Sequence, residues 1–335
     1  MLVFFVILVK RLQDIGERIA IQHIKKILTD RKNINTIGDD CAVIPIGKQY
    51  LLVTTDMIFQ RTHIPSQMTP YQIGWFLIAI NLSDIAAKGG KPLGIVSSLG
   101  LPKTTSESFL KQLIKGEDAC AAHFETTLLG GDIKETQEIT LCGTAVGIVN
   151  KDEFMSRIGS NPDDIVAVTG FLGKAGAGFY SMKTGKGKKY SKDFFEPSPC
   201  LNEGRVLAQQ HTVTSSMDLS DGLSASLYQL QELNNLGFEI QKKALPLAPG
   251  LRFLPTILPS VDPYFLALHF GGDYELLLTI PAQKFQKTKK ALQKKGAPLT
   301  PIGRVTSKKG VFLIDEGKKK VLKDKGYEHF KPHQF

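Results

Sequence analysis

Aspartates recur in this sequence at points where apolar runs end. They fall in six short motifs, and glycine accompanies four of the six. The residues concerned are Asp39, Asp40, Asp56, Asp84, Asp132, Asp218, Asp221 and Asp273. One Asp after a strand is most often a turn or helix-cap residue. The repetition favours a shared binding role instead, because glycine also lets the backbone approach a phosphate or a metal closely.

Asp84 is the most informative of these residues because it lies inside a run, 70–87, that is apolar on nearly all sides. A buried carboxylate is unfavourable unless it is paired, hydrogen-bonded or bound to a cation. Only Lys88, one turn later, offers a nearby basic partner. Several converging carboxylates would repel one another unless a divalent metal neutralised them. Oxygen-rich sites of this kind suit Mg²⁺, which shares its ligand shell with substrate phosphates.

A glycine-rich run at 169–178 follows a predicted strand and precedes a predicted helix, as phosphate-binding loops do. It does not match the Walker pattern, because Ala175 follows Lys174, and it contains no clean G-x-G-x-x-G. A tight strand-to-helix turn explains it at least as well. The sequence therefore offers neither a Walker-type nor a dinucleotide-binding site.

The aspartate motifs lie between predicted helices and strands. Helices are predicted at 18–28, 70–87, 106–124, 219–233 and 282–295. Strands are predicted at 42–46, 50–54, 93–101, 126–129, 139–149, 165–169, 275–280, 303–305 and 310–314. A basic stretch at 183–192 is predicted to be a solvated loop. This alternation indicates α+β or α/β layers, and a polar stretch places a boundary near residue 150, between an N-terminal domain 1–150 and a C-terminal domain 151–335.

The N-terminus and the cysteines bear on where the protein works. The apolar run at 2–9 is too short for a membrane span. It has no preceding positive charge and no cleavage site, so residues 1–13 are predicted to be an extension, or partly a first strand, and not an export signal. The four cysteines form no C-x-x-C pair, which indicates a reducing cytoplasm and no structural zinc.

The net charge of +10 over 335 residues raises the possibility of a nucleic-acid partner. Residues 1–150 hold 15 basic and 14 acidic residues, so the surplus belongs to the second half. There, lysines outnumber arginines and fall on amphipathic faces and loops, which are usually solvated surface. A nucleic-acid-binding protein is therefore the poorer alternative, and neither a nucleic-acid nor a membrane partner is predicted.

Taken in order, the six motifs match a known family. They are Gly38-Asp39-Asp40-Cys41-Ala42, Thr54-Thr55-Asp56 with His63, Asn81-Leu82-Ser83-Asp84-Ile85-Ala86-Ala87, Gly130-Gly131-Asp132, Asp218-Leu219-Ser220-Asp221-Gly222-Leu223 and Gly271-Gly272-Asp273-Tyr274-Glu275-Leu276. From about residue 14 to Phe330 the chain resembles the thiamine-monophosphate kinase family. The resemblance implies an aminoimidazole ribonucleotide synthetase-like fold. Its N-terminal α+β domain would bind ATP and Mg²⁺ and dimerise through its strands, and its C-terminal domain would be α/β.

The resemblance also implies an activity and roles for residues. The activity is direct transfer of the ATP γ-phosphoryl group to thiamine monophosphate, the last step in making thiamine diphosphate, in a homodimer with several Mg²⁺ ions. The implied metal ligands are Asp40, Thr55, Asp56, Asp84, Asp132, Asp218 and Asp221. The implied ATP contacts are Gly131, Asp132, Arg157 and Ser220. The implied substrate contacts are His63, Asp273 and Tyr327.

Two further expectations concern the chemistry. The acceptor phosphate is already anionic near neutral pH, and phosphoryl transfer depends on positioning and charge neutralisation, so no general base is expected. Gly272 stands where relatives often carry an acidic residue that contacts substrate, so Asp273 or the backbone is expected to take that role. The alternative function is another ATP-dependent enzyme of the same superfamily acting on a different phosphorylated substrate.

Overall fold

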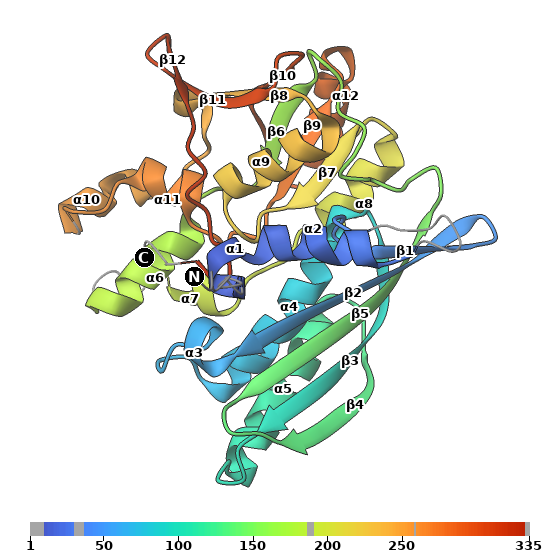
Figure 1. Cartoon of the computed structure of the whole chain (residues 1–335), viewed down its shortest axis with the longest axis vertical. Helices are drawn as coiled ribbons and strands as arrows, with labels where there is room; N and C mark the ends of the chain where they lie inside the picture. Colours follow the sequence, from blue (N-terminus) through green and yellow to red (C-terminus); the bar gives the residue numbers. More distant parts are fainter. Residues whose placement is uncertain (1–9, 30–36, 186–190, 258, 332–335) are drawn as a thin grey trace, which may run out of the picture.

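A computed structural model describes residues 10–29, 37–185, 191–257 and 259–331. The chain forms two sheets, one from each half of the sequence, with helices packed between and around them (Figure 1). The apolar run at 2–9, predicted to be an extension or strand, lies outside the described residues. Within those residues, no helix combines the length and apolar character that a membrane span needs.

The N-terminal sheet has the strand order β1-β2-β5-β3-β4. Its strands are β1 (Ala42–Ile46), β2 (Gln49–Phe59), β5 (Thr140–Asn150), β3 (Lys91–Leu101) and β4 (Leu128–Glu135). Neighbours pair antiparallel except β3 and β4, which are parallel. Helices α4 (Pro70–Ala87) and α5 (Glu107–His123) cover one face of this sheet, and no helix among the described residues covers the opposite face, which we call the uncovered face (Figure 1).

Helix α4 occupies the residues predicted for it, and its start is fixed by local chemistry. Thr69 accepts a hydrogen bond from the Gln72 amide at 3.3 Å, and the Gln72 side chain accepts one from the Thr69 amide at 3.0 Å, with Pro70 in the first turn. The helix packs on β2 and β5 of its own sheet and on α8 (Leu201–Gln210) and β7 (Ser215–Asp218) of the other half. It is therefore buried between the two sheets.

The C-terminal sheet has the order β12-β11-β8-β10-β6-β9-β7. Besides β7, its strands are β6 (Ile165–Thr169), β8 (Gly237–Gln241), β9 (Leu276–Ile280), β10 (Leu299–Thr306), β11 (Gly310–Asp315) and β12 (Lys318–Val321). Its longer helices are α6 (Lys174–Thr184), α9 (Leu223–Asn234), α11 (Pro263–His269) and α12 (Ala282–Gln293). All its pairings are antiparallel except β8 with β11.

The remaining elements are α1 (Leu12–Ile15), α2 (Glu17–Ile27), α3 (Gln60–His63), α7 (Ser191–Phe195), α10 (Leu254–Ile257) and the 3-10 turns η2 (Lys242–Ala244) and η3 (Leu251–Phe253). Helix α2 runs across the junction (Figure 1), and Arg18 forms an ion pair with Asp324 of the C-terminal segment. The predicted two-domain α+β and α/β class is confirmed.

Three local predictions differ from the structure. The stretch at 183–192 is not a continuous loop, because α6 runs to Thr184 and α7 begins at Ser191; residues 186–190 lie outside the described part. The helix predicted from residue 219 begins four residues later, at Leu223, because the preceding turn includes Gly222 at φ +98°. Strands β7, β8 and β12 were not predicted.

Candidate active site

Three aspartates from distant parts of the chain converge at the junction of the two halves. Asp40 precedes β1, Asp84 lies within α4, and Asp218 ends β7. Each offers a carboxylate oxygen, and these oxygens lie within 4.8 Å of one another. The buried position of α4, between the sheets, brings Asp84 to the other two.

Hydroxyl groups hold two of these carboxylates. Thr54 Oγ1 donates to Asp84 Oδ2 at 2.5 Å, and Ser83 Oγ donates to Asp218 Oδ2 at 2.7 Å. Asp40 Oδ2 is also buried, and the Lys88 ammonium lies 2.6 Å from it, at ion-pair distance. A buried carboxylate is stable only when it is paired, hydrogen-bonded or bound to a cation.

Burial and mutual repulsion raise the pKa values of the carboxylates that face the cluster. Burial, with Asp40 as the next cause, raises the pKa of Asp56 to about 6 and that of Asp218 to about 7. Burial and the nearby Asp56 raise the pKa of Asp84 well above its usual value. The site therefore favours protons or cations over bare negative charge.

Asp40 differs because basic side chains surround it. Burial alone would raise its pKa, but Arg157 and Lys88 hold the pKa of this carboxyl below its usual value. Arg157 Nε donates to Asp40 Oδ1 at 3.0 Å, and the same guanidinium also donates to the Gln229 side chain at 3.0 Å. The Lys88 ammonium lies 2.6 Å from Asp40 Oδ2 and 2.5 Å from Asp39 Oδ1.

A cavity of about 460 Å³ adjoins the carboxylates. Its lining includes the acidic side chains Asp56, Asp84, Asp218, Asp221 and Glu17. Aromatic side chains also line it: Phe76, Phe179, Phe194, Phe195, Phe270, Tyr274, Tyr327, His63 and His329. Such a cavity suits a ligand that has a polyanionic end, carried with cations, and an aromatic end.

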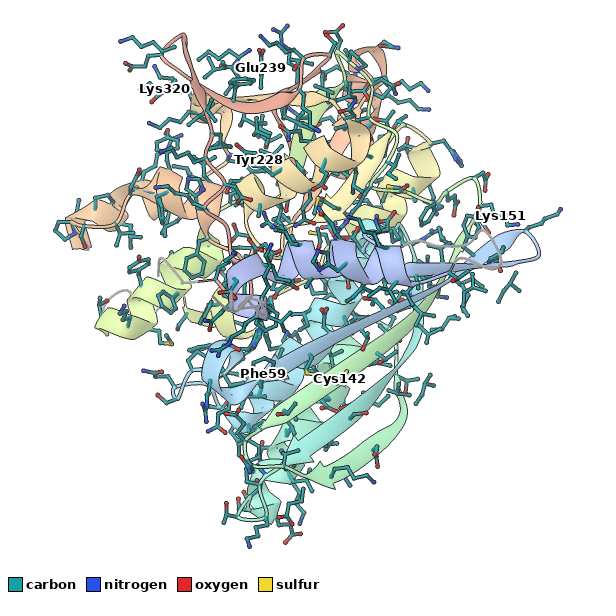
Figure 2. All side chains as sticks on the ribbon, viewed as in Figure 1. Phe59, Cys142, Lys151, Tyr228, Glu239 and Lys320 are labelled. Atoms are coloured by element: carbon teal, nitrogen blue, oxygen red, sulfur yellow. The ribbon has the colours of Figure 1, made fainter. Side chains whose placement is uncertain are left out.

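Several predicted site residues line this cavity. Ser220 and Asp221 enter it from the turn before α9, His63 from α3 and Tyr327 from the C-terminal segment. Burial and the nearby His329 lower the pKa of His63 to about 4, so its imidazole is neutral at pH 7. Figure 2 shows Phe59 at the end of β2, and its amide donates to His63 Nδ1 at 3.5 Å. Thr62 Oγ1 lies 2.7 Å from the same nitrogen, and with Nδ1 taken as the acceptor of both contacts we assign the ring proton to Nε2.

Thr55, Gly131 and Asp132 lie elsewhere in the single chain. Side chains alternate between the two faces of a strand, so Thr55 points to the face opposite Thr54 and Asp56. Thr55 Oγ1 donates to the Gly143 carbonyl at 2.9 Å. The register places Asp132 in one row with Ser98, Cys142 and Met57 across the uncovered face. Asp132 is exposed there and pairs with Lys134 at 3.1 Å.

Asp273 has a structural position that the sequence prediction did not anticipate. It is 3% exposed, accepts hydrogen bonds from the Gly173 amide at 2.6 Å and the Ala175 amide at 3.0 Å, and is not among the described residues that line the cavity. Its carboxylate thus occupies the start of α6, so the glycine-rich run is a strand-to-helix turn. Gly272, at φ +91°, does line the cavity, in a left-handed conformation that disfavours residues with a side chain.

Sequence reasoning missed three contributors to the site. Thr54 could have been found, because it lies two residues before Asp56 on one strand and so shares its face. His329, two residues beyond Tyr327, lies 5.4 Å from His63 between ring centroids. The phenylalanines of α6 and α7 gave no signal, because nothing local in the sequence ties them to an aspartate motif.

The chain matches two family models in succession. The model for the N-terminal domain of AIR synthase related protein matches residues 38–149, and the model for the C-terminal domain matches residues 161–316. Together they cover most of the chain and both sheets. The aminoimidazole ribonucleotide synthetase-like fold predicted from the motifs is confirmed.

Individual relatives narrow the family. The chain is 36% identical to thiamine-monophosphate kinase of Methanospirillum hungatei, covering 88% of this chain and 94% of that one, and 32% identical to the Pyrococcus horikoshii enzyme, covering 89% and 92%. The solved structure of AaThiL complexed with AMPPCP and TMP superposes with a TM-score of 0.85 at 29% identity, covering 96% of this chain and 99% of that one. With this agreement in sequence, fold and motif order, the chain belongs to the thiamine-monophosphate kinase family.

Proposed function

We propose that this protein is a thiamine-monophosphate kinase that transfers the γ-phosphoryl group of ATP to thiamine monophosphate, giving ADP and thiamine diphosphate. The observation that carries the proposal is the cavity lined by both acidic and aromatic side chains. The acidic side chains suit phosphate groups that arrive with cations, and the aromatic side chains suit the two aromatic rings of thiamine. The relatives named above carry the same activity in their names.

The donor set fits Mg²⁺. Asp40, Asp84 and Asp218 supply oxygens within 4.8 Å of one another, and Asp56 adjoins them. Oxygen ligands alone, with no sulfur or imidazole, are the preference of this hard cation. The chemistry that bound Mg²⁺ supplies is neutralisation of the phosphate charges that would otherwise repel one another. Asp221, which lines the same cavity, is the further candidate ligand.

The chain's own residues position the two substrates. The neutral His63, with its proton on Nε2, can donate a hydrogen bond to a substrate phosphate without adding a charge. Tyr327 offers an aromatic face to the thiamine rings, and Ser220 offers a hydroxyl to ATP from the turn before α9. Arg157 lies beside Asp40, and its guanidinium is the proposed positively charged contact to ATP. No general base is required, because the attacking phosphate oxygen is already anionic.

We also propose that the protein is a homodimer formed through the uncovered face of the N-terminal sheet. Two apolar side chains of this face are exposed: Met57, which pairs with Cys142, at 54%, and Val96, which pairs with Thr144, at 38%. Exposed apolar surface of this kind marks association sites. The proposed roles of Thr55 in metal binding, Gly131 in ATP binding and Asp132 in both then depend on the dimer, since all three lie on strands of this sheet.

Two further proposals concern the domain boundary and the cellular location of the protein. A division into domains 1–150 and 151–335 is supported by the end of β5 at Asn150 and the start of β6 at Ile165, with the two family models meeting in the same interval. A cytoplasmic location is supported by the cysteines, because all four lie within the described residues as free thiols.

The proposal is tested by ADP release with different acceptors. Purified protein with ATP and Mg²⁺ is expected to form ADP with thiamine monophosphate, but not with thiamine, which lacks the acceptor phosphate, or with an unrelated phosphate monoester, which lacks the rings. Turnover with the unrelated phosphate and none with thiamine monophosphate would favour the alternative superfamily enzyme.

A further inference from the structure

Lys88 is the most unusual charged residue in this part of the molecule. It follows α4 directly, one turn after Asp84, and its side chain is 0% exposed. Lysines are almost never fully buried unless they are paired. This one lies beside the proposed metal ligands, so its charge bears directly on the proposed site.

The Lys88 ammonium joins three segments of the fold. It donates to Asp39 Oδ1 at 2.5 Å and to the Ser216 carbonyl of β7 at 2.9 Å, and it lies 2.6 Å from Asp40 Oδ2. These contacts tie the end of α4 to the loop before β1 and to β7. The same three segments carry Asp40, Asp84 and Asp218.

Asp39 is the counter-ion that keeps this ammonium in place. Besides Lys88, Asp39 accepts hydrogen bonds at Oδ2 from Ser156 Oγ at 3.1 Å and from the Arg157 amide at 3.2 Å. Both its oxygens are therefore used within the protein. Asp40 differs, because the Lys88 ammonium at 2.6 Å is the contact that the structure gives its Oδ2 among the described residues. A carboxylate oxygen has two lone pairs, so this oxygen can face a metal ion as well as Lys88.

We propose that the Lys88 ammonium is a resident cation of the acidic site: it keeps the site assembled without metal and weakens divalent-cation binding by supplying one positive charge. The inference rests on the proposed metal binding at Asp40, Asp84 and Asp218. A fixed positive charge a few ångströms from a metal ligand repels an incoming divalent ion, and the repulsion is strong because the site is buried. Because of this repulsion, the protein binds its metal ions less tightly and exchanges them more readily with those in solution.

The test is a Mn²⁺-binding titration of the full chain without nucleotide, followed by electron paramagnetic resonance of free Mn²⁺. Lys88→Met keeps the length and apolar stem of the side chain and removes the charge. We expect it to bind Mn²⁺ about tenfold more tightly than the wild type or better. The matched control is Lys91→Met, the same change at an exposed position three residues later, which is expected to bind as the wild type does.

Thermal unfolding gives a second measurement, which does not depend on enzyme activity. Lys88→Met leaves Asp39 without its counter-ion, so its midpoint in EDTA is expected to fall, and added Mg²⁺ is expected to raise that midpoint by more than in the wild type. A purely structural salt bridge would lower the midpoint equally with and without Mg²⁺, and that result would overturn the proposal.

A second pair of variants covers the case in which Lys88→Met does not fold. Asp39→Asn is compared with Asp39→Asn/Lys88→Met, in which no unpaired Asp39 charge remains. The double variant is again expected to bind Mn²⁺ about tenfold more tightly than Asp39→Asn. Equal or weaker binding overturns the role of Lys88 while leaving the metal site intact. Absence of Mn²⁺ binding to the wild type overturns the proposed metal site together with this inference.

Discussion

At the scale of residues, identical side chains acquire different chemistry from their surroundings. Asp40 is held ionised by Arg157 and Lys88, whereas burial and neighbouring carboxylates raise the pKa of Asp84 well above its usual value. Asp273 is also buried, and both its carboxylate oxygens accept hydrogen bonds from backbone amides at the start of α6. Asp84 thus lies among carboxylates that repel one another, whereas Asp40 lies beside cations that pair with it. Residues that bind metal at this site are therefore expected to lower the stability of the metal-free protein.

Asp84→Asn separates these two effects. The variant loses one anionic ligand, so turnover is expected to fall about a hundredfold or more. Stability without metal is expected to rise, because one repelling carboxylate is removed from a buried cluster. Turnover and the unfolding midpoint in EDTA measure the two, with exposed Asp118→Asn on α5 as the control. Full activity in Asp84→Asn would remove Asp84 from the proposed ligands.

The same carboxylates predict how the stability of the metal-free protein depends on pH. The pKa of Asp218 is raised to about 7 by burial and Asp40, so the folded state binds more protons than the unfolded state near neutrality. Stability in EDTA is therefore expected to fall as the pH rises from about 4 to about 7, between the ordinary and the raised pKa of this carboxyl, and to level off above about pH 8. Saturating Mg²⁺ is expected to reduce this dependence of stability on pH, because the metal replaces the protons bound to the carboxylates. Equal slopes in EDTA and Mg²⁺ from calorimetry would contradict this linkage.

At the scale of elements, how well sequence predicts structure depends on how local the signal is. Helix α4 was predicted at its observed bounds because Thr69, Pro70 and an apolar run define it without help from the rest of the chain. Strand β7, with the sequence Ser-Ser-Met-Asp, was missed because four residues carry no period of their own, and its identity comes from pairing with β9. Most of the acidic cluster could be predicted from the sequence motifs. The aromatic side chains that line the cavity could not, because tertiary packing brings them together.

The start of α6 gives a prediction about one element. Asp273→Ala removes two buried hydrogen bonds to backbone amides, and the free energy of unfolding is expected to fall by about 2–4 kcal/mol. KM for thiamine monophosphate is expected to change little, because Asp273 is outside the set of described cavity-lining residues. Urea denaturation and steady-state kinetics measure the two. A large rise in KM with unchanged stability would restore Asp273 as a substrate contact.

At the scale of the whole molecule, basic side chains gather at the end of the C-terminal sheet far from the N-terminal domain. Glu239 and Lys320 mark that end (Figure 2). Lys319 there pairs with Glu239 at 2.6 Å, as solvated surface lysines do. Exposed apolar side chains occur on several elements, among them Met57 of the N-terminal sheet, Ile27 of α2 and Val321 of β12.

The apolar face predicts the response of the assembly to one substitution. Met57→Glu places a charge on a 54% exposed apolar site in the proposed interface and is expected to shift the protein from dimer to monomer. Light scattering after size-exclusion chromatography measures the mass. Gln112→Glu adds the same charge on exposed α5 and is expected to remain dimeric. A wild-type monomer at micromolar concentration would exclude this interface.

The most direct test of the proposed kinase activity follows the transferred group itself. ATP labelled in its γ-phosphoryl group is incubated with thiamine monophosphate, Mg²⁺ and the protein, and the products are separated by chromatography. The label is expected in the terminal phosphate of thiamine diphosphate, in a one-to-one ratio with ADP, and its appearance should require both Mg²⁺ and Asp84. Label that appears only as inorganic phosphate, or no thiamine diphosphate from folded, Mg²⁺-loaded protein, would contradict direct phosphoryl transfer at this site.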